Sequence, residues 1–233
     1  MADVRTNLAE VRSRIDAACR DAGRDPGEVR LLPVTKTHGL ETIRMAYDAG
    51  YRRLGENRVQ EAVAKWQGSL DWPGVEWAII GHLQTNKAKD VARFAVEFQA
   101  LDSVRLAREL DRRLQAEGRG LDVLLEVNSS GEPQKSGVAP DEAAALAAEL
   151  RAYDSLRVRG LMTVAVRSAD PARVGACFER MRTLRERLRQ DDRAAGSYDE
   201  LSMGMSGDFE LAIAHGATCV RVGRAIFGER PPR

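Results

Sequence analysis

Lys36 follows a short apolar run, residues 31–35, that is typical of a buried β-strand and is closed by a turn signal. Side chains alternate between the two faces of a strand, so Lys36, as its last residue, is expected on the same face as Leu32 and Val34. An ammonium there is costly to desolvate, which lowers its pKa and makes the amine a nucleophile toward aldehydes. The alternative is a lysine whose head group extends into solvent. Only five of the 36 basic residues are lysines, so the choice of lysine here is worth testing.

A second candidate is Arg221, which lies in the apolar run of residues 219–222. If the two valines beside it face a layer of helices, alternation turns Arg221 to the opposite face of its strand. A buried guanidinium needs an acceptor, because an unpaired buried charge is heavily penalised. Two kinds of acceptor are equally compatible with the sequence: a carboxylate of the protein, Glu56 or Glu126, or an atom of a bound ligand.

Two glycine-containing turns, residues 203–208 and residues 223–225, follow short apolar runs near the C-terminus. Glycine allows close approach to the backbone, and backbone N–H groups together with a hydroxyl often bind phosphate. Ordinary turn chemistry explains one such turn, but two of them together with Lys36 form a more specific set. An aldehyde-reactive amine and a phosphate site together predict pyridoxal 5′-phosphate as the ligand.

Composition excludes several classes of protein. The formal net charge is +1, which gives no indication of nucleic-acid or membrane binding. Residues 1–20 carry charges throughout, so they do not resemble a signal peptide, and no apolar run approaches the length of a membrane span. The three cysteines are far apart and show no metal-ligand spacing, which predicts a reduced, cytoplasmic chain without a metal site.

Stretches with strand and helix patterns alternate along the chain. Strands are expected at residues 31–36, 53–57, 76–80, 96–101, 121–127, 158–164, 199–203 and 219–222, and helices at residues 4–22, 40–49, 59–66, 85–94, 104–115, 140–152, 171–190 and 208–214. Eight strands alternating with helices predict a (β/α)8 TIM-type barrel with an extra N-terminal helix, as a single domain of residues 1–233. A doubly wound open sheet is the alternative, which the lack of a GxGxxG motif disfavours. Pro33 argues against a central strand of an ordinary sheet, because proline cannot donate a ladder hydrogen bond.

In a barrel, active sites form where the strands end. The expected strand ends carry mostly polar residues or glycine: Lys36, Glu56-Asn57, Gly81-His82, Asp102-Ser103, Asn128, Met162-Thr163, Ser202-Met203 and Gly223. Turn and cap chemistry explains most of the aspartate, asparagine and serine residues, but not Lys36, His82 or Arg221. His82 can act as an acid or base, although capping the next helix is the simpler interpretation. Met203 and Met205 can pack on a flat ring or fill the core.

Several motifs resemble the pyridoxal 5′-phosphate homeostasis protein family, and together they cover essentially the whole chain in order. They are Pro33-Val34-Thr35-Lys36, Gly55-Glu56-Asn57-Arg58-Val59-Gln60-Glu61, Gly81-His82-Leu83-Gln84-Thr85-Asn86-Lys87, Val127-Asn128, Lys135-Ser136-Gly137, Arg159-Gly160-Leu161-Met162-Thr163, Leu201-Ser202-Met203-Gly204-Met205-Ser206, and Val220-Arg221-Val222-Gly223 followed by Ile226-Phe227-Gly228. The combination is highly specific. It implies a barrel similar to the N-terminal domain of alanine racemase.

The resemblance also implies roles for individual residues. Lys36 carries the cofactor as a Schiff base, Arg221 faces the pyridine nitrogen, and Asn57 lies near the ring. The residues implied or expected around the phosphate and ring are Ser202, Met203, Ser206, Gly223 and Arg224. Relatives often have a small hydroxyl residue where this chain has Arg224, and we expect its guanidinium to contact the phosphate. No catalytic residue and no metal ligand is implied.

Arg221 bears on whether the chain is an enzyme. Arginine cannot give up its proton to the pyridine nitrogen, so the ring is a poorer electron sink than a pyridinium paired with a carboxylate. Carbanion chemistry is weakened while aldehyde capture is not, and the racemases have a further domain that this chain lacks. These points favour a cytoplasmic carrier that holds pyridoxal 5′-phosphate, limits free aldehyde and delivers the cofactor to apo-enzymes, and the resemblance implies that it is a monomer. Two alternatives stay open: a weak amino-acid racemase and a phosphosugar aldolase that uses Lys36.

Overall fold

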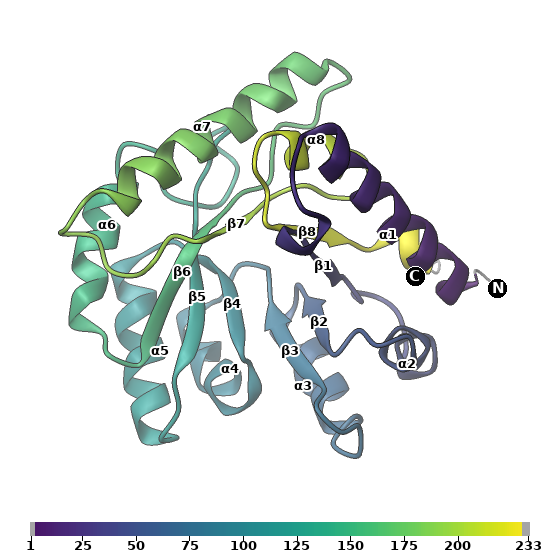
Figure 1. The fold of residues 1–233 in the computed structure, drawn as a ribbon. Coiled ribbons are helices and arrows are strands. Elements are labelled where there is room, and N and C mark those ends of the chain that lie inside the picture. Colours follow the sequence, from purple (N-terminus) through teal and green to yellow (C-terminus); the bar gives the residue numbers. More distant parts are fainter. Residues whose placement is uncertain (1–2, 230–233) are drawn as a thin grey trace.

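The computed structural model describes residues 3–229, in which eight parallel strands form a ring with helices around it (Figure 1). The strands are β1 (Arg30–Pro33), β2 (Arg53–Glu56), β3 (Glu76–Ile79), β4 (Glu97–Leu101), β5 (Leu121–Glu126), β6 (Leu156–Met162), β7 (Glu200–Ser202) and β8 (Cys219–Val222). Each strand from β2 to β8 pairs with the next, and β8 pairs with β1. The predicted barrel is therefore confirmed, and the open doubly wound sheet is excluded.

The seam between β1 and β2 closes the ring without a regular strand ladder. It is formed by a single parallel bridge between Val34 and Gly55 and by the Thr35 N–H, which donates to the Gly55 carbonyl at 2.9 Å. A Cβ on Gly55 would lie 3.3 Å from the side chain of Leu32, so glycine suits this close approach. The barrel thus closes just before Lys36.

The helices cover the outside of the barrel. They are α1 (Val4–Asp21), α2 (Leu40–Asp48), α3 (Val59–Gln67), α4 (Ala88–Phe94), α5 (Val104–Ala116), α6 (Ala143–Glu149), α7 (Pro171–Arg189), α8 (Phe209–Ala214) and α9 (Arg224–Phe227), with short 3-10 turns η1 (Pro26–Glu28), η2 (Thr85–Lys87) and η3 (Leu150–Ala152). The predicted N-terminal helix is α1, whose side chain cap is Asp3. It lies beside α8 in Figure 1 and buries Leu8, Val11 and Ile15 at helical spacing.

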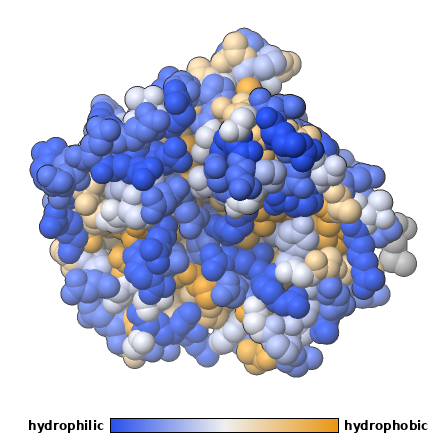
Figure 2. Space-filling model, in the orientation of Figure 1, coloured by the Kyte–Doolittle hydropathy of each residue, from blue (hydrophilic) through white to orange (hydrophobic). Residues whose placement is uncertain are grey.

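The main apolar core lies between the strands and the helices, whereas the barrel interior contains a small cluster around Leu32, Ala78 and Cys219. Val220 and Val222 belong to this main core between strands and helices, the outer core, so alternation along β8 places Arg221 inside the barrel. This agrees with the prediction that Arg221 faces away from the helices if the two valines face them. Figure 2 shows hydrophilic residues over most of one face of the molecule. Among residues 3–229, no helix is long and apolar enough to cross a bilayer.

Some predicted boundaries differ from the structure. β1 ends at Pro33 rather than at Lys36, which lies in a turn; Val34 continues the pairing only as an isolated bridge. The helix expected from Pro140 begins at Ala143, and the one expected from Thr85 consists of η2 followed by α4. The parallel arrangement nevertheless brings the carboxyl ends of all eight strands to one end of the barrel, its mouth.

Candidate functional site

The residues that the sequence predicted as a site all lie at the carboxyl ends of strands or in the segments that follow them, at the mouth of the barrel. They are Lys36 in the turn after β1, Asn57 after β2, Ser202 in β7, Met203 and Ser206 after it, Arg221 in β8, and Gly223 and Arg224 after it. The side chains differ in exposure. Lys36 is half-buried, Met203 is fully buried in the outer core, and Arg224 is exposed.

Arg221 is 4% exposed and is held by two neutral acceptors. Nη1 donates to Ser202 Oγ at 2.7 Å, and Nη2 donates to the carbonyl of Thr163, just after β6, also at 2.7 Å. In the part of the chain that the structure describes, Arg221 forms an ion pair with neither Glu56 nor Glu126. Burial lowers its pKa, and the charges of Cys219, Glu126, Asp208 and Glu97 act in the opposite direction. A guanidinium held without a carboxylate contact is suited to donate to an uncharged acceptor.

Glu126, the last residue of β5, is a second buried ionisable group at the mouth. Burial raises its pKa to about 7, with a further contribution from the negative charge of Asp102, while Arg221 acts in the opposite direction. Its Oε2 has no hydrogen-bond partner among the described residues. The carboxyl group therefore takes up a proton near neutral pH more readily in the folded state than in the unfolded chain.

This shift predicts that the cofactor-free protein loses stability as the pH rises from 4.5 toward 7. A carboxyl whose folded pKa is raised stabilises the fold below its unfolded pKa, and this contribution is lost as pH rises through the folded pKa. The loss due to Glu126 between pH 5 and 8 is about 2–3 kcal/mol. Urea unfolding at both pH values should show that Glu126→Gln flattens the dependence. The exposed Glu117→Gln serves as a control, and equal slopes for wild type and Glu126→Gln would contradict the assignment.

The turn that carries Lys36 is held from outside the barrel by a triad of Glu56, Glu61 and Lys65, of which Glu56 and Lys65 are buried and Glu61 is partly exposed. The Lys65 ammonium donates to Glu56 Oε1 at 2.5 Å, to Glu61 Oε1 at 2.7 Å and to the carbonyl of Thr35 at 2.8 Å. These contacts use its three donors. Because α3 contributes both Glu61 and Lys65, this helix fixes the backbone immediately before Lys36.

The same triad also holds the residue that follows Lys36. The backbone N–H of Thr37 donates to Glu61 Oε1 at 2.5 Å, and Thr37 has a left-handed φ of 70°. Burial works to raise the pKa of Glu61, but the hydrogen bonds from Lys65 and Thr37 outweigh it and lower that pKa. Burial raises the pKa of Glu56 despite the donors around it. The triad is therefore costly to desolvate, and it fixes the backbone on both sides of Lys36.

The loops after β7 and β8 are joined beside β1. The Ala225 N–H donates to Ser206 Oγ at 3.3 Å, which links the two predicted phosphate turns. A Cβ on Gly223 would lie 3.0 Å from the carbonyl oxygen of Val34, so the second turn closely approaches the strand before Lys36. Gly204 has φ 94°, and a Cβ there would lie 2.9 Å from the Cα of Phe209. Glycine is thus required at this bend.

Two further predicted residues line the other side of the mouth. Asn57 has a buried Oδ1 without a hydrogen-bond partner among the described residues, so it can accept a bond from a ligand. His82 is 58% exposed, and its Nδ1 lies 3.5 Å from Asp102 Oδ2. It does not cap the next turn, because the cap residue of η2 is Gln84.

Residues inside the barrel were missed by the sequence interpretation. Glu97 and Gln99 of β4 are buried and connect to Ser202, and through it to Arg221. The available signal was their period-two spacing, since both are polar residues that alternate with Phe98 and Ala100 in an otherwise apolar strand. Lys65 gave a weaker signal, as a lysine in the last turn of a helix.

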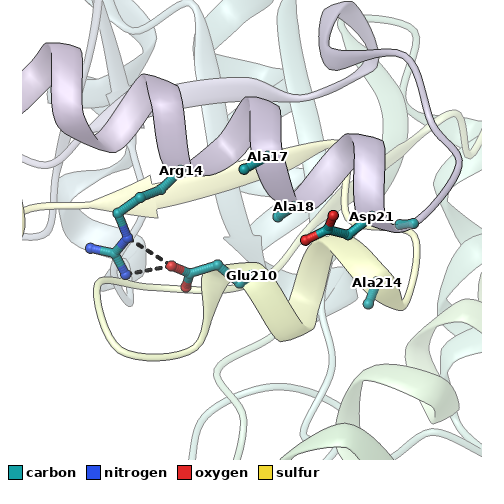
Figure 3. A pocket seen from close by; sticks show the side chains of 7 residues that line it. Arg14, Ala17, Ala18, Asp21, Glu210 and Ala214 are labelled. Atoms are coloured by element: carbon teal, nitrogen blue, oxygen red, sulfur yellow. Dashed lines mark hydrogen bonds and ion pairs between the residues drawn. The ribbon is translucent and has the colours of Figure 1, made fainter.

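A groove of about 310 Å³ lies outside the barrel, between α1 and α8 (Figure 3). Arg14 and Glu210 form an ion pair at 2.5 Å beside it, and alanines make up most of the remaining lining. None of the predicted site residues borders this groove. The candidate site is therefore the mouth of the barrel, where the titratable groups and glycine turns converge.

Comparisons with known proteins place the chain in a family. Residues 6–231 match the family model described as alanine racemase, N-terminal domain. Proteins named pyridoxal phosphate homeostasis protein from Pseudomonas aeruginosa and Escherichia coli K12 are each 41% identical to this chain, covering 99% of it and 97% and 98% of their own lengths.

Solved structures also resemble this chain in fold. PipY of Synechococcus elongatus with PLP bound is 36% identical, with a TM-score of 0.84, over 97% of this chain and 100% of that chain. An alanine racemase from Clostridium difficile has a TM-score of 0.76 at 13% identity, over 100% of this chain and 58% of its own. The latter likeness shows the shared barrel alone.

Proposed function

Because the chain belongs to the pyridoxal phosphate homeostasis protein family, we propose that it binds pyridoxal 5′-phosphate at the barrel mouth and takes part in vitamin B6 homeostasis. The observation that carries this proposal is the arrangement around Arg221. Its buried guanidinium is held by neutral acceptors, at the same end of the barrel as Lys36 and the two glycine turns.

The groups at the mouth fit this cofactor. Arg221 offers a donor without a carboxylate contact, which suits an unprotonated pyridine nitrogen. The buried, unpartnered Oδ1 of Asn57 suits a polar substituent of a ring. Ser206 accepts from Ala225 and keeps its own hydroxyl proton for an anion, between two turns that glycines allow to approach closely.

Each residue then has a defined task. Lys36 would hold the cofactor through a Schiff base, and the clamped turn around it limits the positions of its amine. Ser206, the turn at Gly223 and Arg224 would bind the phosphate, while Arg221 would donate to the ring nitrogen. Ser202 acts indirectly, because its buried hydroxyl is already bonded to Arg221 and Gln99. When bound, the cofactor supplies an electrophilic aldehyde carbon that condenses reversibly with amines.

Arg221 cannot transfer a proton to the ring nitrogen, so the site favours retention of the aldehyde over carbanion chemistry. We therefore propose a carrier rather than an enzyme. It limits free aldehyde and passes the cofactor to apo-enzymes of the cytoplasm, and it acts as a monomer.

The direct test is covalent trapping. Freshly purified protein is expected to absorb visible light, and borohydride should reduce the adduct to a stable pyridoxyl group on the peptide that contains Lys36. Mass spectrometry locates that group and excludes the aldolase alternative. A colourless protein that does not respond to added pyridoxal 5′-phosphate, or a label found only on another lysine, would contradict the proposal.

A second test separates carrier from enzyme. Exchange of the Cα proton of alanine with solvent deuterium is expected to proceed no faster with the loaded protein than with an equal concentration of free cofactor. Proton NMR measures this rate directly. Rapid exchange at low protein concentration would instead support a weak racemase.

Arg224 tests how the phosphate is held. It is the first residue of α9, its side chain is exposed, and it follows the close approach at Gly223. Contact with the phosphate predicts that Arg224→Thr weakens cofactor binding about tenfold, with a shallower salt dependence. Titration at two salt concentrations measures both effects, with the exposed Arg108→Thr of α5 as control. Unchanged affinity would show that Ser206 and the loop amides suffice.

A further inference from the structure

Four side chains form a hydrogen-bonded chain through the barrel interior, from its floor to its mouth. Gln99 Nε2 donates to Glu97 Oε1, Ser202 Oγ donates to Gln99 Oε1 at 2.8 Å, and Arg221 Nη1 donates to Ser202 Oγ at 2.7 Å. All four are buried, and Gln99 and Ser202 have no exposed surface. Solvent therefore cannot replace a missing partner at these positions without entering the barrel.

The lower end of this chain is fixed by charge. Glu97 lies between two arginines at the floor: Arg53 Nη1 lies 2.7 Å, and Arg30 Nη2 3.0 Å, from its Oε2. Arg53 also pairs with Glu76, and Arg30 with Glu200. Carboxylates of three strands, β3, β4 and β7, therefore hold the two guanidinium groups in place. With both guanidinium groups donating to it, Glu97 offers an acceptor oxygen to Gln99.

The two charged ends determine the direction of every bond between them. Arg221 can only donate, so Ser202 must accept from it and direct its own proton to the next group. Glu97 can only accept, so Gln99 must turn its NH2 group toward Glu97 and its carbonyl oxygen toward Ser202. A flipped Gln99 amide would place its oxygen against the Glu97 carboxylate and its NH2 group against the Ser202 proton. Gln99 is thus the group through which Glu97 orients the upper half of the chain.

We propose that Gln99 is a positioning residue for recognition of the cofactor's ring nitrogen, acting through Ser202 to hold the Arg221 guanidinium. This inference rests on the proposed function. Thr163 fixes Nη2 from β6, and the Gln99–Ser202 pair fixes Nη1 from β4 and β7. Without Gln99, Ser202 loses the acceptor that directs its hydroxyl proton, so the oxygen that accepts from Nη1 is no longer held in a fixed orientation.

The test compares two ligands in two proteins. Pyridoxal 5′-phosphate and its 1-deaza analogue, which carries C–H in place of the ring nitrogen, differ at the atom that Arg221 recognises. Wild type is expected to bind the natural cofactor more tightly than the analogue. Gln99→Met, which is nearly the same size but cannot form these bonds, should reduce that preference about tenfold while leaving affinity for the analogue within about twofold. Gln115→Met, at an exposed position of α5, should leave the preference unchanged.

Gln99→Glu provides a rescue. Its protonated carboxyl can donate to Glu97 and accept from Ser202, as Gln99 does, whereas its ionised form cannot. The neighbouring Arg30, Arg53 and Arg221 stay charged throughout the accessible pH range. The ligand preference of Gln99→Glu should therefore match wild type at pH 6 and fall toward that of Gln99→Met at pH 9.

The outcomes separate the inference from the proposed function. Equal weakening of both ligands in Gln99→Met, or an unchanged preference, would overturn the positioning role while leaving cofactor binding intact. If Gln99→Met does not fold, the pH profile of Gln99→Glu decides, and a flat profile would overturn the role. A wild type that binds neither ligand would instead overturn the proposed function.

Discussion

Lys65→Met is expected to lower the free energy of unfolding by about 3–5 kcal/mol at pH 8. The side chain of Lys65 is 8% exposed and that of Glu56 is fully buried, so the substitution leaves a carboxylate without its cation in the protein interior. The substitution also removes the donor to the Thr35 carbonyl. This is one of the two hydrogen bonds by which the triad fixes the backbone on either side of Lys36, the other being that from the Thr37 N–H to Glu61. Cofactor affinity should therefore fall together with stability.

The expected cost depends on pH. Burial already raises the pKa of Glu56 with Lys65 present, and without Lys65 the carboxyl will protonate at still higher pH. Lys65→Met should therefore be less damaging at pH 5 than at pH 8. Urea unfolding at both values measures this difference, with Lys89→Met, an exposed lysine of α4, as the control.

A double variant isolates the pair. Glu56→Gln combined with Lys65→Met removes the uncompensated charge, and the combination should be more stable at pH 8 than Lys65→Met alone. Additive losses in the double variant would show that the two side chains contribute independently. They would also show that the triad does not act as a unit.

Gly160→Ala is the second substitution with a large expected effect. A Cβ at Gly160 would lie 1.8 Å from the carbonyl oxygen of Glu200, its partner in the neighbouring strand. Because that atom belongs to backbone, β6 and β7 must separate, and we expect a loss of about 3 kcal/mol or more. Thr163 and Ser202, the two acceptors of Arg221, follow this contact by three and two residues along the chain, so the separation should also weaken cofactor binding.

The control for this variant is Gly207→Ala. Gly207 has no heavy atom within 4 Å of an added Cβ and no positive φ. Its unfolding free energy should stay within about 0.5 kcal/mol of wild type. Thermal or urea unfolding distinguishes the two alanines, and equal stability for both would show that β6 and β7 can move apart at little cost.

The sequence predicted the eight strands well because hydrophobic alternation and turn residues are local signals. The features that the sequence did not predict depend on contacts between residues far apart in the chain. The strand pattern continued to Lys36, but the chain turns earlier because Glu61 and Lys65 of α3 bind the residues on either side of it. Likewise, the inward direction of Arg221 followed from its flanking valines, whereas its partners did not. Ser202 lies 19 residues from Arg221 in sequence, and Gln99 a further 103 residues away.

The seam between β1 and β2 has a consequence for motion. With a single bridge at Val34 and one amide bond from Thr35, the backbones of β1 and β2 are joined by fewer hydrogen bonds than those of β5 and β6, so local opening is easier at this seam than within the β5–β6 ladder. A ligand that binds only the closed ring stabilises it by mass action. The Thr35 amide is therefore expected to exchange with solvent deuterium faster than amides within the β5–β6 ladder, and to slow when pyridoxal 5′-phosphate is added. Binding of the cofactor would then stabilise the closed form of the barrel at the seam between β1 and β2.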